Sequence, residues 1–311
     1  MLFLVILAGG IVRSTGAGMG CPDWPMCFDR VVPPTDISQL PANYQEIYAD
    51  RGYSSMEFNV VKTWTEYINR LIGALTGLAL LICTFFAIKI RKTNKKAFFL
   101  TIAALVAIVF QGWLGGQVVA YELLPFMVTI HMLVALVIIG LMIWAILSIK
   151  GTKESISTVN SKMSLIYGLS IVAILLLFVQ IVFGTQVREQ INVIAKENGF
   201  FNRASWITDL GSTFHFHRTG SIVYVLINVA LFVLVRKLNL IQSKIGFYHS
   251  ALLAFIGLQM LSGILLNYFG FPPAAQTIHL FFSSVIFGLQ FYMLIKMHQL
   301  QLISKKGVGN E

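Results

Sequence analysis

The stretch FQGWLGGQVVAYELLPFMVTIHM (residues 110–132) occurs a second time, in altered form, as LQMLSGILLNYFGFPPAAQTIHL (residues 258–280). A fixed repeat spacing indicates duplicated structural units. Here each unit combines a long apolar run with a Pro and a His. The offset is 148 residues throughout, and it matches Gln111 with Gln259, Gly115 with Gly263, Pro125 with Pro273, and His131 with His279.

Two further segments repeat upstream of these. The same offset of 148 carries Asn69-Arg70, in TWTEYINRLIG (63–73), onto His217-Arg218. GGIVR, which ends at Arg13, also resembles GTQVR, which ends at Arg188, with a different spacing because the first loop is longer. The sequence therefore predicts two homologous halves.

The composition is that of a membrane protein, since 57% of the 311 residues are hydrophobic and only 12% are charged. A helix needs about 20 apolar residues to cross the hydrocarbon core. We predict an all-α membrane protein whose eight transmembrane helices form two pseudo-symmetric four-helix bundles. The predicted spans are 1–12, 64–88, 97–119, 124–149, 163–187, 213–235, 246–269 and 274–297.

The spans divide the chain into a first half (1–149), a cytoplasmic linker (150–162), a second half (163–298) and a cytoplasmic tail (299–311). Each half has an even number of spans, so both should have the same orientation, related by an axis along the membrane normal. The run at 1–12 is short for a span, which leads us to expect missing upstream residues or a late start codon. A signal peptide is the alternative, although the cleavage site would be poor.

Charge sets the expected orientation, because Lys and Arg near span ends stay cytoplasmic. The connections after spans 64–88, 124–149 and 213–235 are rich in Lys and Arg, whereas the loop 13–62 carries six acidic and four basic residues. Both termini are therefore expected to be cytoplasmic. This bias accounts for most of the net charge of +10, so the lipid bilayer, and no nucleic acid, is the expected partner.

Two of the three cysteines lie close together in GMGCPDWPMC (18–27), on the predicted outer side. An oxidising compartment permits a disulfide between Cys21 and Cys27. Spacing alone leaves two unpaired thiols as the alternative. Cys83 is interpreted as a packing residue within its span.

The six histidines are not equivalent. His249 and His298 lie at predicted cytoplasmic span ends and are interpreted as interfacial, whereas His131, His217 and His279 lie near outer span ends. Buried ionisable side chains in a membrane indicate function, although a lone His can simply hydrogen-bond across helices. His217 and His279, on two helices of one half, predict a bis-histidine heme site. Zinc is a weaker alternative because it needs more ligands than these.

Four arginines lie close to the predicted outer ends of the spans. An Arg there can extend to the lipid headgroups, or it can bind a heme propionate through paired hydrogen bonds. The sequence leaves both interpretations open for Arg13, Arg70, Arg188 and Arg218.

The first half differs from the second at two aligned positions. Asn69 stands where the second half has His217, and Glu66 stands where it has Phe214. The first half therefore has an open, acidic site, which suggests chemistry there and electron storage in the second half. The alternative is an i, i+4 pair of Glu66 with Arg70 that only neutralises two buried charges.

The combination of GGIVRSTGAGMGCPDWP, EYINR, TIH, HR and the second TIH resembles the heme A synthase family over nearly the whole chain. The resemblance implies an enzyme that oxidises a methyl group of heme O, its substrate, to the formyl group of heme A for terminal oxidases. It implies a heme b in the second half and a prokaryotic, multi-pass cell membrane protein. The implied residues are His217 and His279 as axial ligands of heme b, His131 at the substrate iron, Glu66 as the catalytic carboxylate, and Cys21 and Cys27 as a cysteine pair.

Asn69 departs from the family pattern Glu-x-x-His-Arg. An amide is a poor axial ligand, so either His131 holds the substrate iron alone or water fills the other position. The expected partners are heme O synthase, terminal oxidase assembly factors and an unidentified electron acceptor. Two other functions stay open: a quinone-linked b-type cytochrome, in which Glu66 is structural, and a heme transporter or chaperone.

Overall fold

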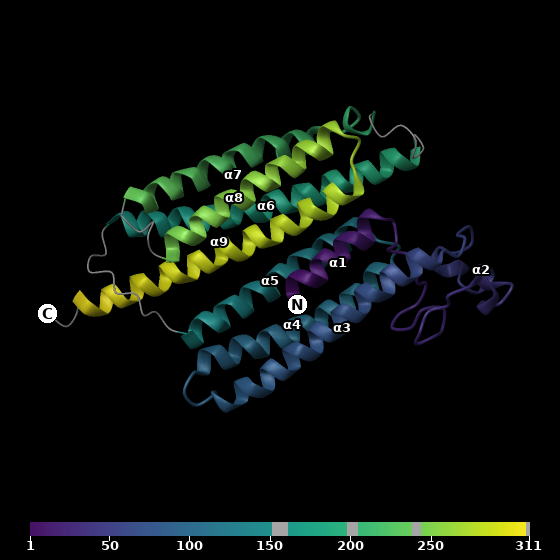
Figure 1. Cartoon of the computed structure of the whole chain (residues 1–311), viewed down its shortest axis with the longest axis horizontal. Coiled ribbons are helices and arrows are strands. Elements are labelled where there is room, and N and C mark those ends of the chain that lie inside the picture. The colour runs from purple at the N-terminus through teal and green to yellow at the C-terminus, as the bar shows by residue number, and fades with distance from the viewer. Residues whose placement is uncertain (151–160, 198–204, 238–243, 309–311) are drawn as a thin grey trace.

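The computed structural model describes residues 1–150, 161–197, 205–237 and 244–308, and within these it is helical apart from an outer loop and short connections (Figure 1). Among these described residues, seven helices are long and apolar enough to cross a membrane, while α1 (Leu2–Ser14) is shorter. The prediction of an all-helical protein with several membrane-spanning helices is confirmed. The seven are α3 (Val60–Lys89), α4 (Lys95–Ala120), α5 (Pro125–Lys150), α6 (Ser161–Glu197), α7 (Ser212–Lys237), α8 (Lys244–Tyr268) and α9 (Pro273–Val308).

Local sequence explains where several helices begin. The side chains of Asn59 and Asn94 cap α3 and α4 by accepting the backbone N–H of Lys62 at 3.0 Å and of Ala97 at 2.9 Å. The repeat-related residues Pro125 and Pro273 open α5 and α9, where a missing N–H costs nothing.

Two helices are longer than predicted. α6 continues past the predicted end at residue 187 to Glu197, and α9 continues past residue 297 to Val308, so much of the predicted tail is helical. Both extensions consist mostly of good helix formers and contain no Pro. Most of the predicted linker, residues 151–160, lies outside the described residues.

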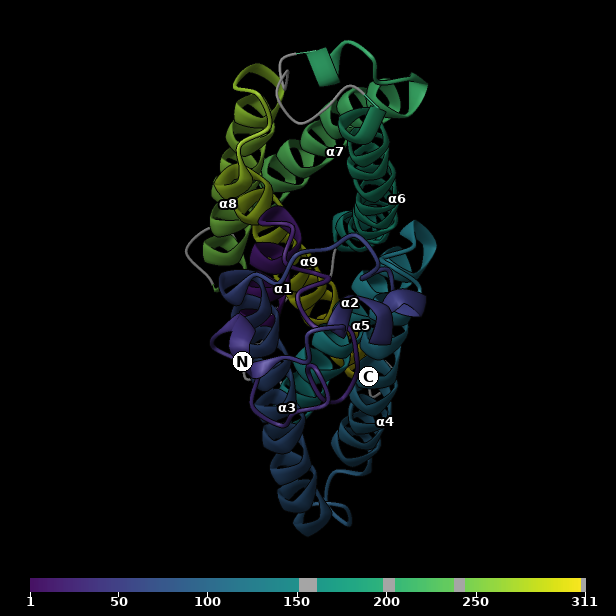
Figure 2. The ribbon, with the colours of Figure 1, turned by 90° about the vertical axis from the view of Figure 1, so that its right-hand side faces the viewer.

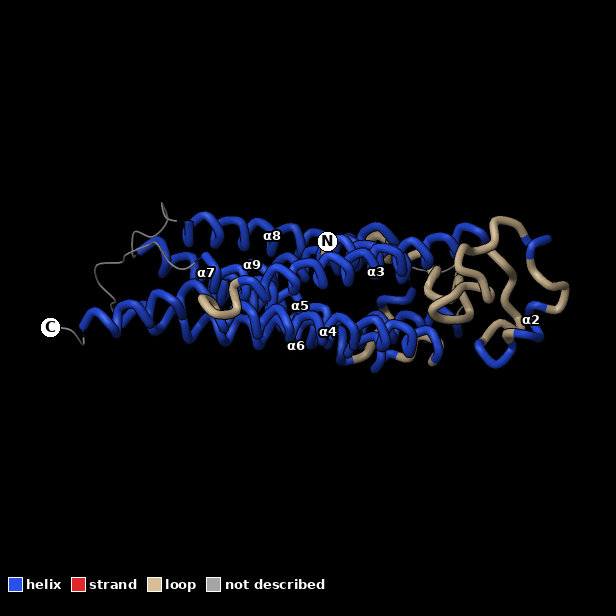
Figure 3. Tube along the Cα trace, turned by 90° about the horizontal axis from the view of Figure 1, so that it is seen from below, coloured by secondary structure: helices blue, strands red, loops and turns tan. Residues whose placement is uncertain are grey.

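The helices pack in two closed rings that lie beside each other (Figures 1 and 2). One ring has the order α1, α3, α4, α5, and the other has the order α6, α7, α8, α9. α9 also packs against α1 and α5, which joins the rings. Figure 3 shows the long helices running along one common direction, with the outer loop at one end and the C-terminus at the other.

The apolar residues divide between a buried core and an outward-facing surface. The core centres on α5 to α9 and includes Ile166, Leu231 and Met297. Large apolar side chains such as Phe85 and Phe99 are exposed and line neither of the two cavities described below. Outward-facing apolar helices suit a hydrocarbon surround.

The outer loop, residues 15–59, folds on an aromatic cluster that surrounds the Cys21–Cys27 disulfide. The predicted disulfide is thus present. The loop contains three short helical turns, η1 (Ile37–Gln39), α2 (Tyr44–Ile47) and η2 (Ala49–Arg51). Phe28 lies at the centre of the cluster, with its ring packed edge-on against those of Tyr44, Tyr48, Tyr53 and Phe58.

Candidate functional site

A cavity of about 460 Å³ lies within the ring α6 to α9, and two imidazoles line it. His217 comes from α7 and His279 from α9, two helices that are not adjacent in the ring. Their ring centroids are 6.3 Å apart. The repeat thus brings together the two histidines that were predicted as a pair. We call this space the smaller cavity.

Each of these histidines is oriented through its Nδ1 atom. His217 Nδ1 donates to the backbone carbonyl of Gln180 at 3.1 Å, and His279 Nδ1 lies 2.9 Å from Ser262 Oγ. Ligating histidines usually use one ring nitrogen for such an orienting bond and the other for the metal. Nε2 is therefore the nitrogen available in both rings.

Glycines on the neighbouring helices make room for the rings. A Cβ atom added to Gly184 or Gly263 would lie 3.3 Å or 3.4 Å from Cε1 of His217 or His279. The first half has the same arrangement, since a Cβ on Gly115 would lie 3.3 Å from His131 Cε1. Three imidazoles thus each pack against a glycine.

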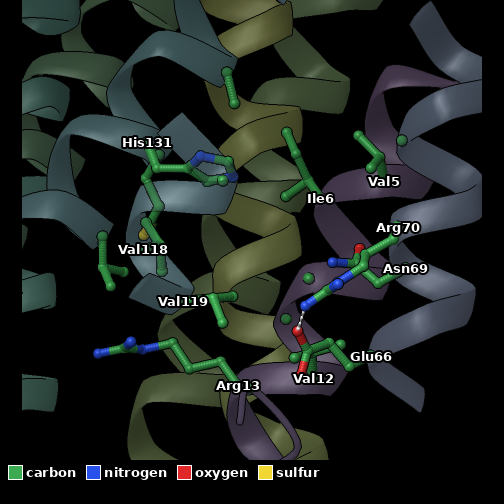
Figure 4. Close-up of a pocket in the computed structure, with 18 of the residues that line it drawn as sticks. Val5, Ile6, Val12, Arg13, Glu66, Asn69, Arg70, Val118, Val119 and His131 are labelled. Carbon is green, nitrogen blue, oxygen red and sulfur yellow. Dashed lines mark hydrogen bonds and ion pairs between the residues drawn. The ribbon is translucent and has the colours of Figure 1, made fainter. Parts of the chain in front are cut away.

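A larger cavity, of about 1810 Å³, is lined mainly by the four helices of the ring α1, α3, α4, α5. Figure 4 shows His131, from α5, on one side of it and Glu66, Asn69 and Arg70, from α3, on the other. The residues predicted to form the first-half site therefore line one space.

Glu66 and Arg70 are held together by the outer loop. Glu66 is only 3% exposed; it accepts the Cys21 backbone N–H at 3.0 Å and pairs with Arg70 at 2.5 Å. Arg70 also donates to the backbone carbonyls of Asp23 at 2.7 Å and Met26 at 2.8 Å. The i, i+4 pair is therefore present, and it is anchored to the segment that the disulfide closes.

The other three arginines differ in their surroundings. Arg13 and Arg188 line both cavities. Arg13 lies 3.9 Å from the carboxylate of Glu189, whereas the Arg188 guanidinium lies 5.7 Å from the ring centroid of Phe271. Arg218 is exposed at the edge of the smaller cavity. Each of the three thus places a cationic side chain on the lining of at least one cavity.

A family model described as Cytochrome oxidase assembly protein (COX15-CtaA) matches residues 1–291 of this chain. The chain belongs to this family. The match spans both cavities and every candidate residue described above.

Several bacterial relatives of this cytochrome oxidase assembly protein family carry the name Heme A synthase. The Rickettsia prowazekii protein is 23% identical over 320 residues, which cover 93% of this chain and 92% of the relative. The Flavobacterium johnsoniae protein is 23% identical over 330 residues, covering 96% and 94%. The Shewanella oneidensis protein is 31% identical over 181 residues, covering 58% and 52%.

The groups that orient the site residues were not predicted from the sequence of this family member. Ser262, Gln180 and the loop carbonyls were not expected, because a backbone carbonyl is present at every position and Ser is common in membrane helices. The prediction that His249 is interfacial is wrong, since it is 1% exposed and its Nδ1 donates to the Ile245 carbonyl at 3.1 Å. The side chain lies on the buried face of α8, and the carbonyl that it donates to belongs to the preceding turn of the same helix.

Gly20→Ala is expected to displace the outer loop from α3. A Cβ at Gly20 would lie 2.6 Å from the Lys62 carbonyl oxygen. The adjacent bonds from Thr63 Oγ1 to the Gly20 carbonyl, at 2.8 Å, and from the Cys21 N–H to Glu66 would then be broken. Overpacking of this kind costs about 1–3 kcal/mol. Hydrogen–deuterium exchange should show faster exchange at residues 19–22.

The matched control for this loop variant is Gly257→Ala in α8, where an added Cβ would have no neighbour within 4 Å. It should leave exchange in the loop unchanged. Slow exchange at residues 19–22 in Gly20→Ala would contradict the close packing of loop and helix.

Proposed function

We propose that this chain is a heme A synthase, which oxidises a methyl substituent of heme O to the formyl group of heme A. Family membership and relatives of that name along more than nine tenths of the chain support the proposal. The single observation that carries it is the placement of the buried Glu66 carboxylate on the same cavity as His131. An electron carrier has no need of a buried carboxylate there.

His217 and His279 would hold a heme b in the smaller cavity. If one iron bound Nε2 of both rings, the distance between the ring centroids would be the sum of two metal–nitrogen bonds of about 2 Å and the two distances from nitrogen to ring centre. That sum is about 6 Å. The observed 6.3 Å agrees with that spacing. A heme bound there would supply one-electron transfer. Arg188 and Arg218, at the outer end of this cavity, would bind its propionates.

The larger cavity would take heme O as substrate, with His131 toward the iron and Glu66 toward the methyl group. Arg13 would bind a propionate. Arg70 would act through Glu66, because its guanidinium already donates to that carboxylate and to loop carbonyls. Its role would be to hold the Glu66 carboxylate in place.

The proposed reaction needs both proton and electron acceptors. With water as the oxygen source, R–CH₃ + H₂O gives R–CHO + 4 H⁺ + 4 e⁻. Glu66 would accept a proton that leaves the methyl carbon, as a general base. The electrons would pass through the second half to an acceptor outside the chain, such as a membrane quinone.

We also propose how the helices are arranged in the membrane. α1 would be the eighth span, because it packs on α3 and α9 as α6 packs on α7 and α5. The halves 1–149 and 163–298 would then be pseudo-symmetric bundles, and both termini would be cytoplasmic. Heme O synthase and terminal oxidase assembly factors would be the partners that deliver heme O and receive heme A.

Mass spectrometry of extracted hemes tests this function. Membranes that contain the chain and a source of heme O should accumulate hydroxylated heme O and heme A. Membranes that bind heme b yet form neither product would favour the b-type cytochrome. Unchanged heme O that is released to an acceptor protein would favour the transporter or chaperone.

A further inference from the structure

The two rings place different side chains across from their repeat-related histidines. In the second ring, His217 on α7 faces His279 on α9. In the first ring, α3 and α5 hold the same relative places, but α3 presents Asn69 across the larger cavity from His131 (Figure 4). The first half therefore offers one imidazole and one amide.

The space beside Asn69 still suits a larger side chain. A Cβ on Gly184 would lie 3.3 Å from the His217 ring. Gly9 occupies the matching place in GGIVR, and a Cβ there would lie 3.9 Å from Asn69 Oδ1. The glycine that makes room for an imidazole is thus retained, although the imidazole is absent.

The amide oxygen of Asn69 is buried and makes no hydrogen bond to the described part of the chain. Burying such an atom unpaired costs free energy. An orphaned amide oxygen that lines a cavity indicates a polar group within the cavity as its partner.

His131 also differs from its repeat counterpart. His279 Nδ1 lies at hydrogen-bond distance from Ser262 Oγ, but the repeat offset places Leu114 at the position of Ser262. His131 Nδ1 is buried without a partner among the described residues. The His131 ring therefore lacks the orienting hydrogen bond that the His279 ring has.

We propose that heme in the larger cavity has His131 as its one protein ligand and that Asn69 faces the open sixth coordination position. A carboxamide is a poor iron ligand, but it carries both hydrogen-bond donors and an acceptor. Water or a small diatomic molecule would bind at that position and hydrogen-bond to the Asn69 amide. This inference rests on the proposed binding of heme in the larger cavity.

Carbon monoxide is the probe for the open position. The purified full-length chain, loaded with two equivalents of iron protoporphyrin IX and reduced, should bind CO at one heme and leave the other low-spin. Asn69→His should abolish CO binding and convert the heme to a low-spin spectrum. Asn69→Ala should keep CO binding and raise its dissociation rate about 2- to 10-fold, through loss of one hydrogen bond.

The matched variant lies in the other half. His217→Asn recreates the amide–imidazole pair in the smaller cavity and should add a second CO-binding heme. Two low-spin hemes that do not bind CO in the wild-type chain would overturn the inference, as would CO binding that persists in Asn69→His. Loading of only one heme, with heme A formation also absent, would instead refute the proposed function.

Discussion

Glu66→Gln is expected to lower the rate of heme A formation by about 10²- to 10⁴-fold, the usual contribution of a general base. Gln has the volume of Glu and can still accept from the Cys21 N–H, so the 3.0 Å contact between loop and helix should survive. It cannot accept a proton from a methyl group. Mass spectrometry of hemes over a time course measures the rate, and the visible spectrum should keep its low-spin b-type signal.

The control for this variant is Glu57→Gln, an exposed glutamate of the outer loop. Both substitutions exchange a carboxylate for an amide, but Glu57 is exposed and lines neither cavity, so its substitution should leave the rate unchanged. Wild-type turnover in Glu66→Gln would reduce Glu66 to a structural partner of Arg70. In that case Arg70→Lys, which loses the forked donation to Glu66 and the loop carbonyls, would destabilise the loop without affecting the chemistry.

The sequence predicted the helices and the histidine pair because both depend on side-chain type. An apolar run of span length is helical in lipid, since backbone groups there can only bond within the segment. The constant offset of 148 then places His279 at the depth of His131, and Pro125 and Pro273 at equivalent helix starts. These relations follow from residue identity and spacing alone.

The rest could not be predicted, because it depends on main-chain atoms and close approach. The Asp23 and Met26 carbonyls that hold Arg70 belong to a loop whose path depends on the disulfide and the aromatic cluster. No local pattern shows that Gly20 will lie against Lys62. The pairing of Glu66 with Arg70 was foreseen only as an alternative, because its spacing fits both interpretations.

His217→Ala and His279→Ala are each expected to abolish the low-spin b-type spectrum. Either change removes one of two imidazoles whose centroids lie 6.3 Å apart, and the remaining ring cannot supply both axial positions. The vacated side-chain volume lies against Gly184 or Gly263, which offer no replacement ligand. Heme content per protein, measured by the reduced pyridine hemochrome, should fall, because the smaller cavity then offers one ligand where two are needed.

His215→Ala is the matched control, because His215 is exposed and lies only two residues before His217 on α7. A shift of two residues turns a helical side chain by about 200°, so His215 cannot replace His217. A low-spin spectrum that persists in both His217→Ala and His279→Ala, but disappears in His215→Ala, would show that the heme binds outside the smaller cavity. Ser262→Ala, which removes the bond to His279 Nδ1 together with the bond that Ser262 Oγ donates to the Gln259 carbonyl of the same helix, should keep the heme and shift its reduction potential, because the bond to His279 tunes the basicity of the ring.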